Sequence, residues 1–443
     1  MKLHLAKCAA LAAWCAPFLA AQGPDTTTLK QVIIFGRHAA RTPVTSPSNL
    51  DHFSALPCLS FFPSGAAMIT PNGQANEILL GQYFRLWLTQ ENLLTGNDNA
   101  DAAFVYVRAN NTPLIVDTAQ AFVTGLLPGA TVGVNTVSLP DPLFDPIDAG
   151  VATLDTNMAV AAVNGRLGGN PQSLATTYAS ELALARSVLF NYPAGTTPAP
   201  ATPAGKIDVT TIPITMTSGV TPGNATTPVN PGGLGPVYLA IDPFLLEYVD
   251  GWNMSNVGWG NLDAAGISQI YRVYDALLDL EYRTPYLASV QSSNVASHIV
   301  RTLVQASTGN AMTGTLGTPA DKIVVLTASN TNITGLAGLF QLDWLVQGFQ
   351  RDVAALGGAL VFELRQSQTG EFIVRVVYIT QTMDQLRNRT LLALSTPAAN
   401  VPGNVPVFVP GCSIDNATFD CPLSTFVQVA GQAINANNAD LIH

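Results

Sequence analysis

The chain has 443 residues, of which only 11% are charged, and its formal net charge is −10 at neutral pH. A nucleic-acid-binding protein needs a basic face for the phosphates, so this charge balance excludes nucleic acid as an expected partner. The length is enough for one large domain with an insertion, or for two domains.

Residues 1–21 have the pattern of a cleaved secretory signal. Lys2 and Lys7 precede an apolar run, CAALAAWCAPFLAA, that ends in the small residues Ala20 and Ala21. The run is short for a membrane span, so we expect cleavage after residue 21 rather than an anchor. The expected location is outside the cell or in the lumen of the secretory pathway, and we expect no membrane span.

Three cysteines remain after the signal, namely Cys58, Cys412 and Cys421. In an oxidising compartment we expect a disulfide between Cys412 and Cys421, which closes a short loop near the C-terminus. Cys58 is then left over, and we expect it to be buried and unreactive. Because no Cys/His spacing indicates zinc, no metal and no other cofactor is expected.

The low charge density suits a secreted glycoprotein. Six sequons for N-glycosylation support this interpretation, although Asn and Thr are abundant and a sequon in a buried element would stay unmodified. The acceptor residues are Asn110, Asn224, Asn253, Asn332, Asn388 and Asn416.

In the N-terminal third, strands and helices are expected to alternate. The continuous apolar run in 31–38 predicts a strand that is covered on both faces. A helix is predicted over 70–88 with Thr70 as its cap, followed by a strand over 102–109 and a helix over 116–129.

The middle of the chain differs in composition. Residues 193–236 are rich in Pro, Thr and Gly, which predicts a long loop or several irregular turns. Helices are expected again over 243–252 and 267–283. The strands expected in the C-terminal third are 322–329, 359–366 and 372–380, the last two as an antiparallel pair.

This order of elements predicts the fold class. Alternating strands and helices at both ends of the chain, with a mainly helical stretch between them, favour an α/β sandwich with an inserted cap. The expected parts are 22–130 and 291–443 for the α/β domain and 131–290 for the cap.

The segment FGRHAARTPV, residues 35–44, places Arg37, His38 and Arg41 directly after a predicted strand. The carboxyl ends of strands are where open α/β sheets bind ligands. Guanidinium groups suit phosphate or carboxylate, and a histidine between them can attack phosphorus or carry a proton. The segment therefore predicts an anion pocket. The alternative is that both arginines pair with surface carboxylates and that the histidine is a core residue.

RHAARTP resembles the Arg-His-Gly-x-Arg-x-Pro signature of the histidine acid phosphatases. Further blocks that resemble this family follow in order and cover most of the mature chain. The resemblance implies an α/β domain, a mostly helical cap and a cleft between them. The blocks are ITPNGQAN (69–76), YVRANNTPLIVDTAQAF (106–122), RTPYLA (283–288), VVLTASNTNITGL (324–336) and PGCSIDNATFDCPLSTFV (410–427).

The resemblance also implies roles for single residues. In the family a histidine accepts the phosphoryl group, three arginines and a second histidine hold its oxygens, and an aspartate protonates the leaving group. His38 matches the nucleophile, and Arg37 and Arg41 match the first two arginines. Ala39 replaces the family's glycine, which is a smaller departure.

The remaining family positions have changed. The third arginine aligns with Leu114, and the histidine–aspartate pair aligns with Ser329 and Asn330. Loss of a general acid costs about 10²–10⁴ in rate, and loss of a charge-stabilising donor costs about 10²–10³. Efficient hydrolysis of phosphate monoesters is therefore not expected, unless the fold brings another acid to the pocket. The acids considered for that role are Glu77, Asp117 and Asp242.

The sequence instead favours an enzyme whose substrate is an apolar, oxygenated organic molecule. Leu114, Ser329 and Asn330 would line the pocket beside the retained donors. An enzyme can promote a reaction other than hydrolysis by orienting its reactants and by placing a cationic donor on a carbonyl oxygen. Candidate aromatic walls from the cap, with ordinary packing as their alternative role, are Tyr248, Trp252 and Trp259.

The chain carries a signal and sequons and lacks a known catalytic motif. In this general character it is similar to the secreted fungal hetero-Diels–Alderases of tropolone–sesquiterpenoid pathways. That similarity implies a cyclase or cycloaddition catalyst of fungal secondary metabolism. Two alternatives remain open: an acid phosphatase or phytase with residual or altered activity, and a non-catalytic, ligand-binding pseudophosphatase. In each case the expected partner is a small molecule, and a homodimer stays open.

Overall fold

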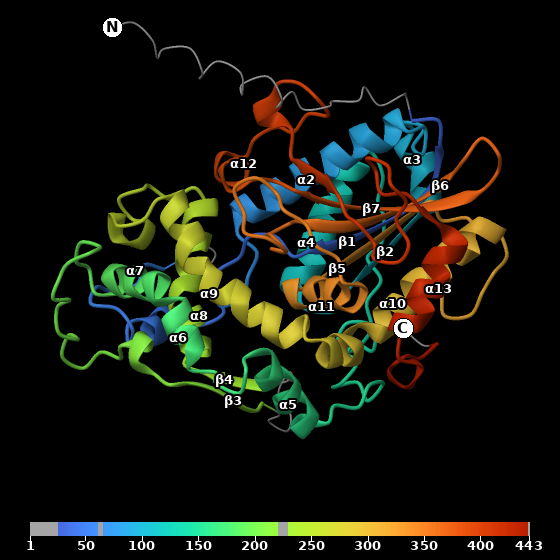
Figure 1. Ribbon diagram of the computed structural model, residues 1–443. Coiled ribbons are helices and arrows are strands. Elements are labelled where there is room, and N and C mark those ends of the chain that lie inside the picture. The colour runs from blue at the N-terminus through green and yellow to red at the C-terminus, as the bar shows by residue number, and fades with distance from the viewer. Residues whose placement is uncertain (1–24, 61–64, 220–228, 442–443) are drawn as a thin grey trace, which may run out of the picture.

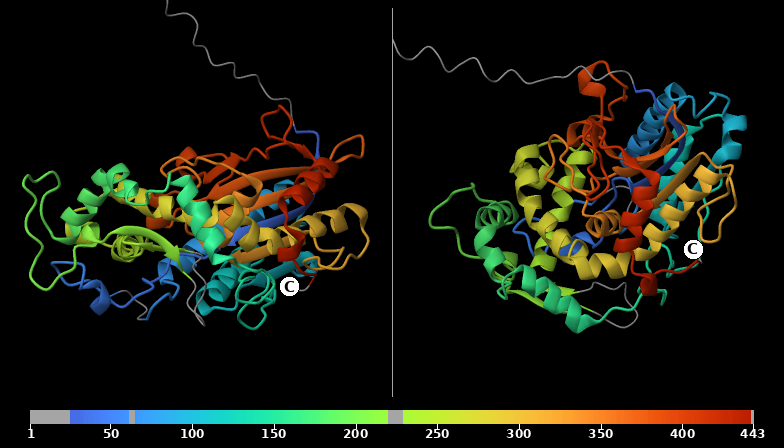
Figure 2. Two further views of the ribbon diagram at one scale, coloured as in Figure 1. Left: turned by 60° about the horizontal axis from the view of Figure 1, so that its bottom comes forward. Right: turned by 45° about the vertical axis from the view of Figure 1, so that its right-hand side comes forward.

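The structure is a computed structural model that describes residues 25–60, 65–219 and 229–441. The predicted signal segment and the sequon at Asn224 lie outside these residues. Helices cover both faces of a central sheet, and a second group of helices lies beside one edge of this body (Figures 1 and 2).

The central sheet has seven strands in the order β2-β5-β1-β6-β7-β8, with β9 paired to β7. β2, β5 and β1 run parallel, and β6 to β9 extend the sheet antiparallel. All strands expected from the sequence are present, and β6 and β7 form the predicted antiparallel pair. The strands are β1 (Thr28–Arg37), β2 (Val105–Ala109), β5 (Ile323–Ala328), β6 (Ala359–Gln366), β7 (Phe372–Thr380), β8 (Gly403–Pro406) and β9 (Cys421–Pro422).

The register of β1 and β5 determines where the site forms. Arg37, the last residue of β1, lies opposite Ala328, the last residue of the parallel strand β5. The His38 N–H donates to the Ala328 carbonyl at 2.9 Å. The residues that follow both strands, His38 and Ser329, therefore leave the sheet at the same edge.

Helices pack against both faces of the sheet (Figure 1). Each face has its own hydrophobic core, so β1 is buried on both sides as its continuous apolar run predicts. The Thr70 hydroxyl accepts from the Gly73 N–H and caps the first of these helices, which confirms the predicted cap. The helices are α2 (Pro71–Gln90) and α4 (Pro113–Leu126) on one face, and α10 (Pro285–Thr308), α11 (Asn330–Phe340) and α13 (Leu423–Ala433) on the other.

The backbones of α2 and α4 approach closely at two glycines. A Cβ added to Gly81 would lie 2.1 Å from the Phe122 carbonyl oxygen, and one added to Gly125 would lie 2.0 Å from that of Ile78. No side chain fits at such a distance, so these positions hold the two helices in contact.

We expect Gly81→Ala to lower the free energy of unfolding by about 1–3 kcal/mol or more, because the helices must move apart. Gly165 is the matched control, since it is also helical but a Cβ there meets nothing within 4 Å. Gly165→Ala should be neutral or stabilise by about 0.5–1 kcal/mol. Urea denaturation of both variants checks the pair of expectations, and similar effects at the two sites would contradict them.

The cap is a group of helices with its own core, beside the sheet edge that holds His38 (Figure 2). Between its helices, β3 (Ile214–Ser218) pairs antiparallel with β4 (Val229–Gly232). The cap helices are α5 (Thr156–Arg166), α6 (Ser173–Thr177), α7 (Ala179–Leu189), α8 (Leu234–Val249) and α9 (Ala264–Tyr282).

The expectation of one long loop over 193–236 is therefore wrong in part. This segment contains β3, β4 and the start of α8, and α8 begins at Leu234 rather than at residue 243. Pro243 lies inside α8, where it removes a backbone hydrogen bond. Most of the residues of this helix are buried, and their packing offsets the loss. Similarly, β2 begins only at Val105, because a 3₁₀ turn occupies Ala102–Phe104.

The disulfide between Cys412 and Cys421 is present as predicted. Cys58 is free and half-buried rather than fully buried. Burial raises the pKa of its thiol to about 11, so the thiol stays protonated at neutral pH.

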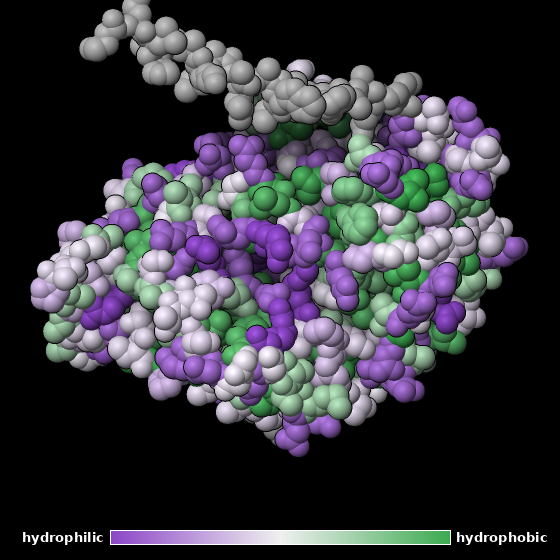
Figure 3. All heavy atoms as spheres, viewed as in Figure 1, coloured by the Kyte–Doolittle hydropathy of each residue, from purple (hydrophilic) through white to green (hydrophobic). Residues whose placement is uncertain are grey.

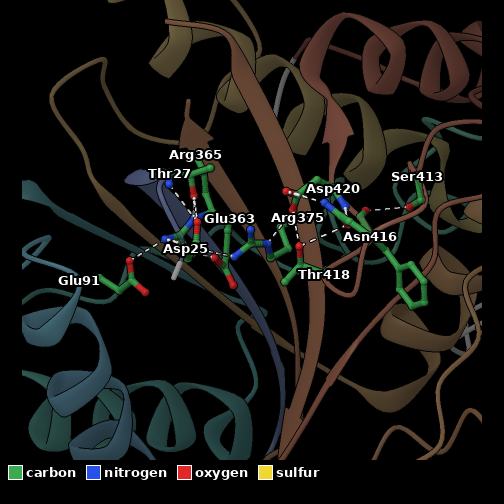
Figure 4. A network of polar contacts seen from close by, with 11 residues as sticks. Asp25, Thr27, Glu91, Glu363, Arg365, Arg375, Ser413, Asn416, Thr418 and Asp420 are labelled. Carbon is green, nitrogen blue, oxygen red and sulfur yellow. Dashed lines mark hydrogen bonds and ion pairs between the residues drawn. The ribbon is translucent and has the colours of Figure 1, made fainter. Parts of the chain in front are cut away.

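At the end of the sheet away from His38, two buried arginines link residues near the start of the described chain to residues near its end (Figure 4). Arg365 donates to Glu363, Glu91 and Thr27, at 2.6–2.7 Å. Arg375 donates to Asp420 and Asp25, each at 2.8 Å. Thr27 precedes the ten-residue strand β1, so this network lies about 30 Å from His38 and is structural.

Short helices complete the fold: α1 (Pro47–Leu50), α3 (Asp98–Asp101) and α12 (Met383–Asn388). Among the helices of residues 25–60, 65–219 and 229–441, none combines the length and the hydrophobicity that a membrane span needs.

Candidate functional site

A large cavity, which we call the main cavity, lies where the cap meets the edge of the sheet. Its volume is about 1400 Å³, and its walls come from the end of β1, the start of α4, the start of α11 and the helices α8, α9 and α10. Hydrophilic residues gather across the middle of the face shown in Figure 3, where the cap and the α/β body meet. The site residues predicted from the sequence that line this cavity are His38, Arg41, Leu114, Ser329 and Asn330.

The imidazole of His38 is held in one tautomer. Its Nδ1 lies 2.9 Å from the Ala39 carbonyl oxygen, and since that oxygen can only accept, Nδ1 carries the ring proton. Burial lowers the pKa of His38 well below its ordinary value, and the charges of Arg37 and Arg41 lower it further. The ring is therefore neutral, with the Nε2 lone pair available toward the main cavity.

Ala39 fits without strain where related sequences have glycine. Its φ is not positive, and its N–H donates to the Thr118 hydroxyl of α4 at 3.1 Å. The Thr118 hydroxyl in turn donates to the Leu114 carbonyl oxygen at 2.7 Å. The backbone after His38 is thus fixed from α4, and the substitution leaves the histidine in place.

Arg41 is buried and paired. Its Nη1 lies 3.0 Å from Oδ2 of Asp242, and its Nη2 donates to the Tyr238 hydroxyl at 3.2 Å. Both partners belong to α8 of the cap. The alternative interpretation of the sequence was that both arginines pair with surface carboxylates. Arg41 does pair with a carboxylate, but that carboxylate is buried. The positive charge that Arg41 offers to a ligand is largely offset.

Arg37 lines a different space. A smaller cavity of about 50 Å³, which we call the rear cavity, is lined by Arg37 and Asp275 among mostly apolar residues. The Arg37 Nη1 donates to the Ala354 carbonyl oxygen at 2.7 Å. Asn330 and Tyr274 line both cavities, so the two spaces lie back to back.

Tyrosines from the cap separate the two cavities, and sequence reasoning missed them. The rings of Tyr238 and Tyr274 stack with centroids 4.0 Å apart. The Tyr274 hydroxyl accepts from Nδ2 of Asn330 at 3.0 Å, and the Tyr271 hydroxyl donates to Oδ1 of Asp242 at 3.2 Å. In the sequence these residues follow ordinary helical spacing, which indicates core packing as readily as a site.

The three changed positions form one wall of the main cavity. Leu114 lies in the first turn of α4 and is nearly buried. Ser329 is the N-cap of α11, and its N–H donates to the side-chain oxygen of Asn332. Asn330 is the first residue of the same helix. A hydrocarbon, a hydroxyl and an amide therefore lie around the ligand space beside His38.

Comparison with known proteins shows what this chain is similar to. The model of the histidine phosphatase superfamily (branch 2) matches residues 28–187. A phytase of Escherichia coli (strain K12) is 28% identical over 93% of this chain and 94% of its own length. A glucose-1-phosphatase of Providencia rettgeri is 25% identical over 98% of both chains. The structure of a Hafnia alvei phytase in complex with tartrate superposes with a TM-score of 0.80 at 26% identity, covering 94% of this chain and 100% of that one.

Residues 28–187 match the histidine phosphatase superfamily (branch 2), and the chain is similar over nearly its whole length to phytases and a glucose-1-phosphatase. The resemblance to the histidine acid phosphatases is confirmed, and so is the α/β fold that it implies. The similarity to hetero-Diels–Alderases has no support from these relatives, all of which are named as phosphatases or phytases.

Asn330, which the resemblance aligns with the family's aspartate, is not an acid, and the acids considered from the sequence do not line the main cavity. Glu77 is buried on α2 and does not line the main cavity. Asp117 is exposed on α4, and Asp242 is paired with Arg41. Three carboxyl residues that sequence reasoning missed line the main cavity, namely Asp145, Asp148 and Glu281, and burial raises the pKa of Glu281 to about 8.

The three aromatic residues predicted as walls are not among the residues that line the main cavity. The Tyr248 hydroxyl contacts Asp384, and the Trp252 indole donates to Asp250 at 3.2 Å. The Trp259 indole donates to the Pro57 carbonyl oxygen at 3.0 Å. These contacts hold the three rings within the cap and away from the main cavity, which is lined instead by Tyr238, Tyr274 and Tyr282.

The asparagines of several predicted sequons form hydrogen bonds inside the fold. The side-chain amides of Asn110, Asn332 and Asn416 donate to Asp145, to the Phe144 carbonyl oxygen and to Asp420, and a glycan would break each bond. Asn253 and Asn388 are exposed. No group of three or more metal-ligating side chains is present in the part of the chain that the structure describes.

Proposed function

We propose that this protein binds phosphate monoesters in the main cavity and transfers the phosphoryl group to His38, with slow turnover that is restricted to esters of good leaving groups. The observation that carries this proposal is the state of His38. The ring is neutral, its Nδ1 proton is held by Ala39, and its Nε2 lines a cavity large enough for an organic phosphate.

The proposed reaction has two steps. In the first, the Nε2 lone pair forms a bond to phosphorus, the ester P–O bond breaks, and its electron pair stays on the departing oxygen. In the second, water attacks the phosphohistidine, the N–P bond breaks, and inorganic phosphate leaves the neutral imidazole. An acid beside the ester oxygen would assist the first step, and its conjugate base would assist the second.

Asn330 can supply neither proton transfer, because an amide does not titrate in this range. An alkoxide leaving group then departs without a proton, which is unfavourable. An aryl oxide, in contrast, departs without help. The missing acid therefore limits the range of substrates more than it limits phosphoryl transfer as such.

The charge at the site favours weak binding of phosphate. Arg41 is offset by Asp242, Arg37 lines the rear cavity, and Leu114 occupies the position of a cation. Relatives at 26% identity are described as phytases in complex with tartrate and with myo-inositol hexakis sulphate, both of which are oxyanions. We infer that the same cavity takes phosphate esters here, with lower affinity.

A leaving-group series tests this proposal. Turnover of p-nitrophenyl phosphate should exceed that of an alkyl phosphate by about 10²–10⁴, the contribution expected of the missing acid. His38→Ala should abolish both reactions. Glu281→Gln is the control for one of the three carboxyl residues that line the cavity, Asp145, Asp148 and Glu281, and it should leave the ratio unchanged. Equal rates for aryl and alkyl esters would contradict the proposal.

A second candidate is a non-hydrolytic enzyme or a binding protein for an uncharged, oxygenated organic molecule. The offset charge of Arg41 and the apolar side chain of Leu114 favour it. A cycloaddition or another cyclisation is its finer form, and a non-catalytic pseudophosphatase is its simplest. Failure of p-nitrophenyl phosphate to react or to bind, with tight binding of a neutral polyketide or terpenoid, would favour this candidate.

We also propose that the protein is secreted. The N-terminal signal pattern and the disulfide between Cys412 and Cys421 support this location. Mass spectrometry of protein exported by the producing cells should find the mature N-terminus at Gln22.

A further inference from the structure

The rear cavity combines one cation and one carboxyl group with an apolar wall. Arg37 is nine-tenths buried, and its Nε has no hydrogen-bond partner among the described residues. Asp275 also lines the cavity, yet the two side chains form no ion pair within the described part of the chain. A buried guanidinium that keeps an unsatisfied N–H and has no carboxylate partner is costly, so an anion beside it in this cavity would be stabilised.

The size and the lining of the rear cavity restrict what that acceptor is. A volume of about 50 Å³ holds roughly three to five non-hydrogen atoms, since a single water needs about 10–15 Å³. Most of the lining is hydrocarbon, which suits a short alkyl group and not a phosphate dianion. Apolar side chains around the space include Leu245, Ile267, Leu278, Met383 and Leu386.

The rear cavity also adjoins a surface groove on the side away from the main cavity. The groove has a volume of about 520 Å³ and shares part of its lining with the rear cavity. Ser268 and Gln350 stand at this junction, where Nε2 of Gln350 donates to the Ser268 hydroxyl at 3.1 Å. The residues common to both spaces are Ser268, Gly348, Phe349, Gln350 and Met383.

We propose that the rear cavity is a binding site for a carboxylate of two or three carbons, separate from the phosphate-ester site. The carboxylate accepts from the Arg37 guanidinium, and the protonated Asp275 carboxyl donates to it. The alkyl group lies on the side chains of Ile267 and Met383. Because Arg37 immediately precedes His38, an anion on this guanidinium also weakens the positive field at the nucleophile, and the site is therefore inhibitory.

The surroundings of Asp275 support this assignment. Burial raises its pKa to about 7, although the charge of Arg37 opposes the shift, so it is a proton donor in mildly acidic solution. The titratable groups that face it are Arg37 from β1, Tyr178 from the turn before α7, and Tyr271 and Tyr274 from its own helix. Above the pKa of Asp275 its carboxylate repels a carboxylate ligand, and binding is expected to weaken.

Calorimetric titration of the mature chain with propionate tests the proposal without any need for enzymatic activity. We expect saturable binding of one propionate per chain in mildly acidic solution, and weaker binding of formate, which lacks the alkyl group. Met383→Trp fills the cavity and should lower the affinity at least about tenfold. Gln269→Trp is the matched control, because Gln269 lines the groove but not the rear cavity, and it should leave affinity unchanged.

Two further variants keep the test decisive. Should Met383→Trp not fold, Ser268→Leu blocks the same junction from α9 and carries the same expectation. Asp275→Asn should raise the affinity about threefold or more above the pKa of Asp275, because it removes the repelling charge. Absence of saturable binding, or binding that is unchanged when the junction is blocked, would overturn the proposal. Failure of His38 to accept a phosphoryl group would not affect this result.

Discussion

Replacing Asn330 by aspartate, together with Leu114→Arg and Ser329→His, is expected to raise the turnover of an alkyl phosphate by at least about 10²-fold. The aspartate would take the place of the amide at the start of α11. The Tyr274 hydroxyl, which now accepts from Asn330, can instead donate to the new carboxylate, so the contact survives. The gain should be largest for alkyl esters, because aryl esters do not need the proton.

Thr331→Asp is the control for this triple change. Thr331 also lines the main cavity and lies one residue further along α11, so the variant adds the same charge to the same helix end. Steady-state rates for an alkyl and an aryl phosphate provide the comparison. An equal gain from Thr331→Asp, or no gain from the triple variant, would mean that the missing acid does not limit this protein.

Asp242→Asn should have the largest effect on stability. It leaves Arg41 as a buried cation without its carboxylate, and loss of one partner from a buried ion pair costs about 3–5 kcal/mol. Added inorganic phosphate should recover part of the loss, because the freed guanidinium becomes a ligand for the anion. Urea denaturation with and without phosphate measures both effects.

The matched control for this change is Asp279→Asn. Asp279 pairs with Arg166 in the same cap, but both side chains are more than a third exposed. Exposed pairs contribute about 0–1 kcal/mol, so the control should change little and should not respond to phosphate. Equal losses in the two variants would show that Asp242 does not hold the charge of Arg41.

The sequence predicted the parts of the site that local patterns determine. A continuous apolar run identifies β1, and the residues that follow it, including His38, must then lie at the sheet edge. The second block, around Ser329, was also placed correctly, because β5 is parallel to β1 and ends beside it. The resemblance to the histidine acid phosphatases implied that His38 and Asn330 share a site, and both residues line the main cavity.

Contacts between segments that lie far apart in the sequence could not be predicted from local patterns. Asp242 lies 201 residues from Arg41 in the sequence, and no local pattern shows that the cap carries a counter-charge into the site. The start of α8 was missed because a proline usually marks a helix end, whereas burial of the helix tolerates Pro243 in its interior. The orientation of Arg37 toward the rear cavity depends on packing from the cap, which composition does not reveal.

The aromatic residues illustrate the same limit. Trp252 and Trp259 were predicted in the wall of the main cavity from their place in the cap alone. Their indole N–H groups instead satisfy local acceptors, and the tyrosines of α8 and α9 provide the aromatic surface. The sequence predicted aromatic side chains in the wall of the main cavity, but only the fold shows which aromatic residues lie there.

The most direct test is whether His38 becomes phosphorylated. Rapid mixing of the protein with excess p-nitrophenyl phosphate should release a burst of one equivalent of nitrophenol, followed by slow turnover, because the second step lacks its base. Mass spectrometry of the quenched protein should locate one phosphoryl group on His38, and His38→Ala should show neither signal. Nitrophenol release without a burst and without a phosphorylated histidine, at the same rate in His38→Ala, would contradict the assignment of this cavity as a phosphoryl-transfer site.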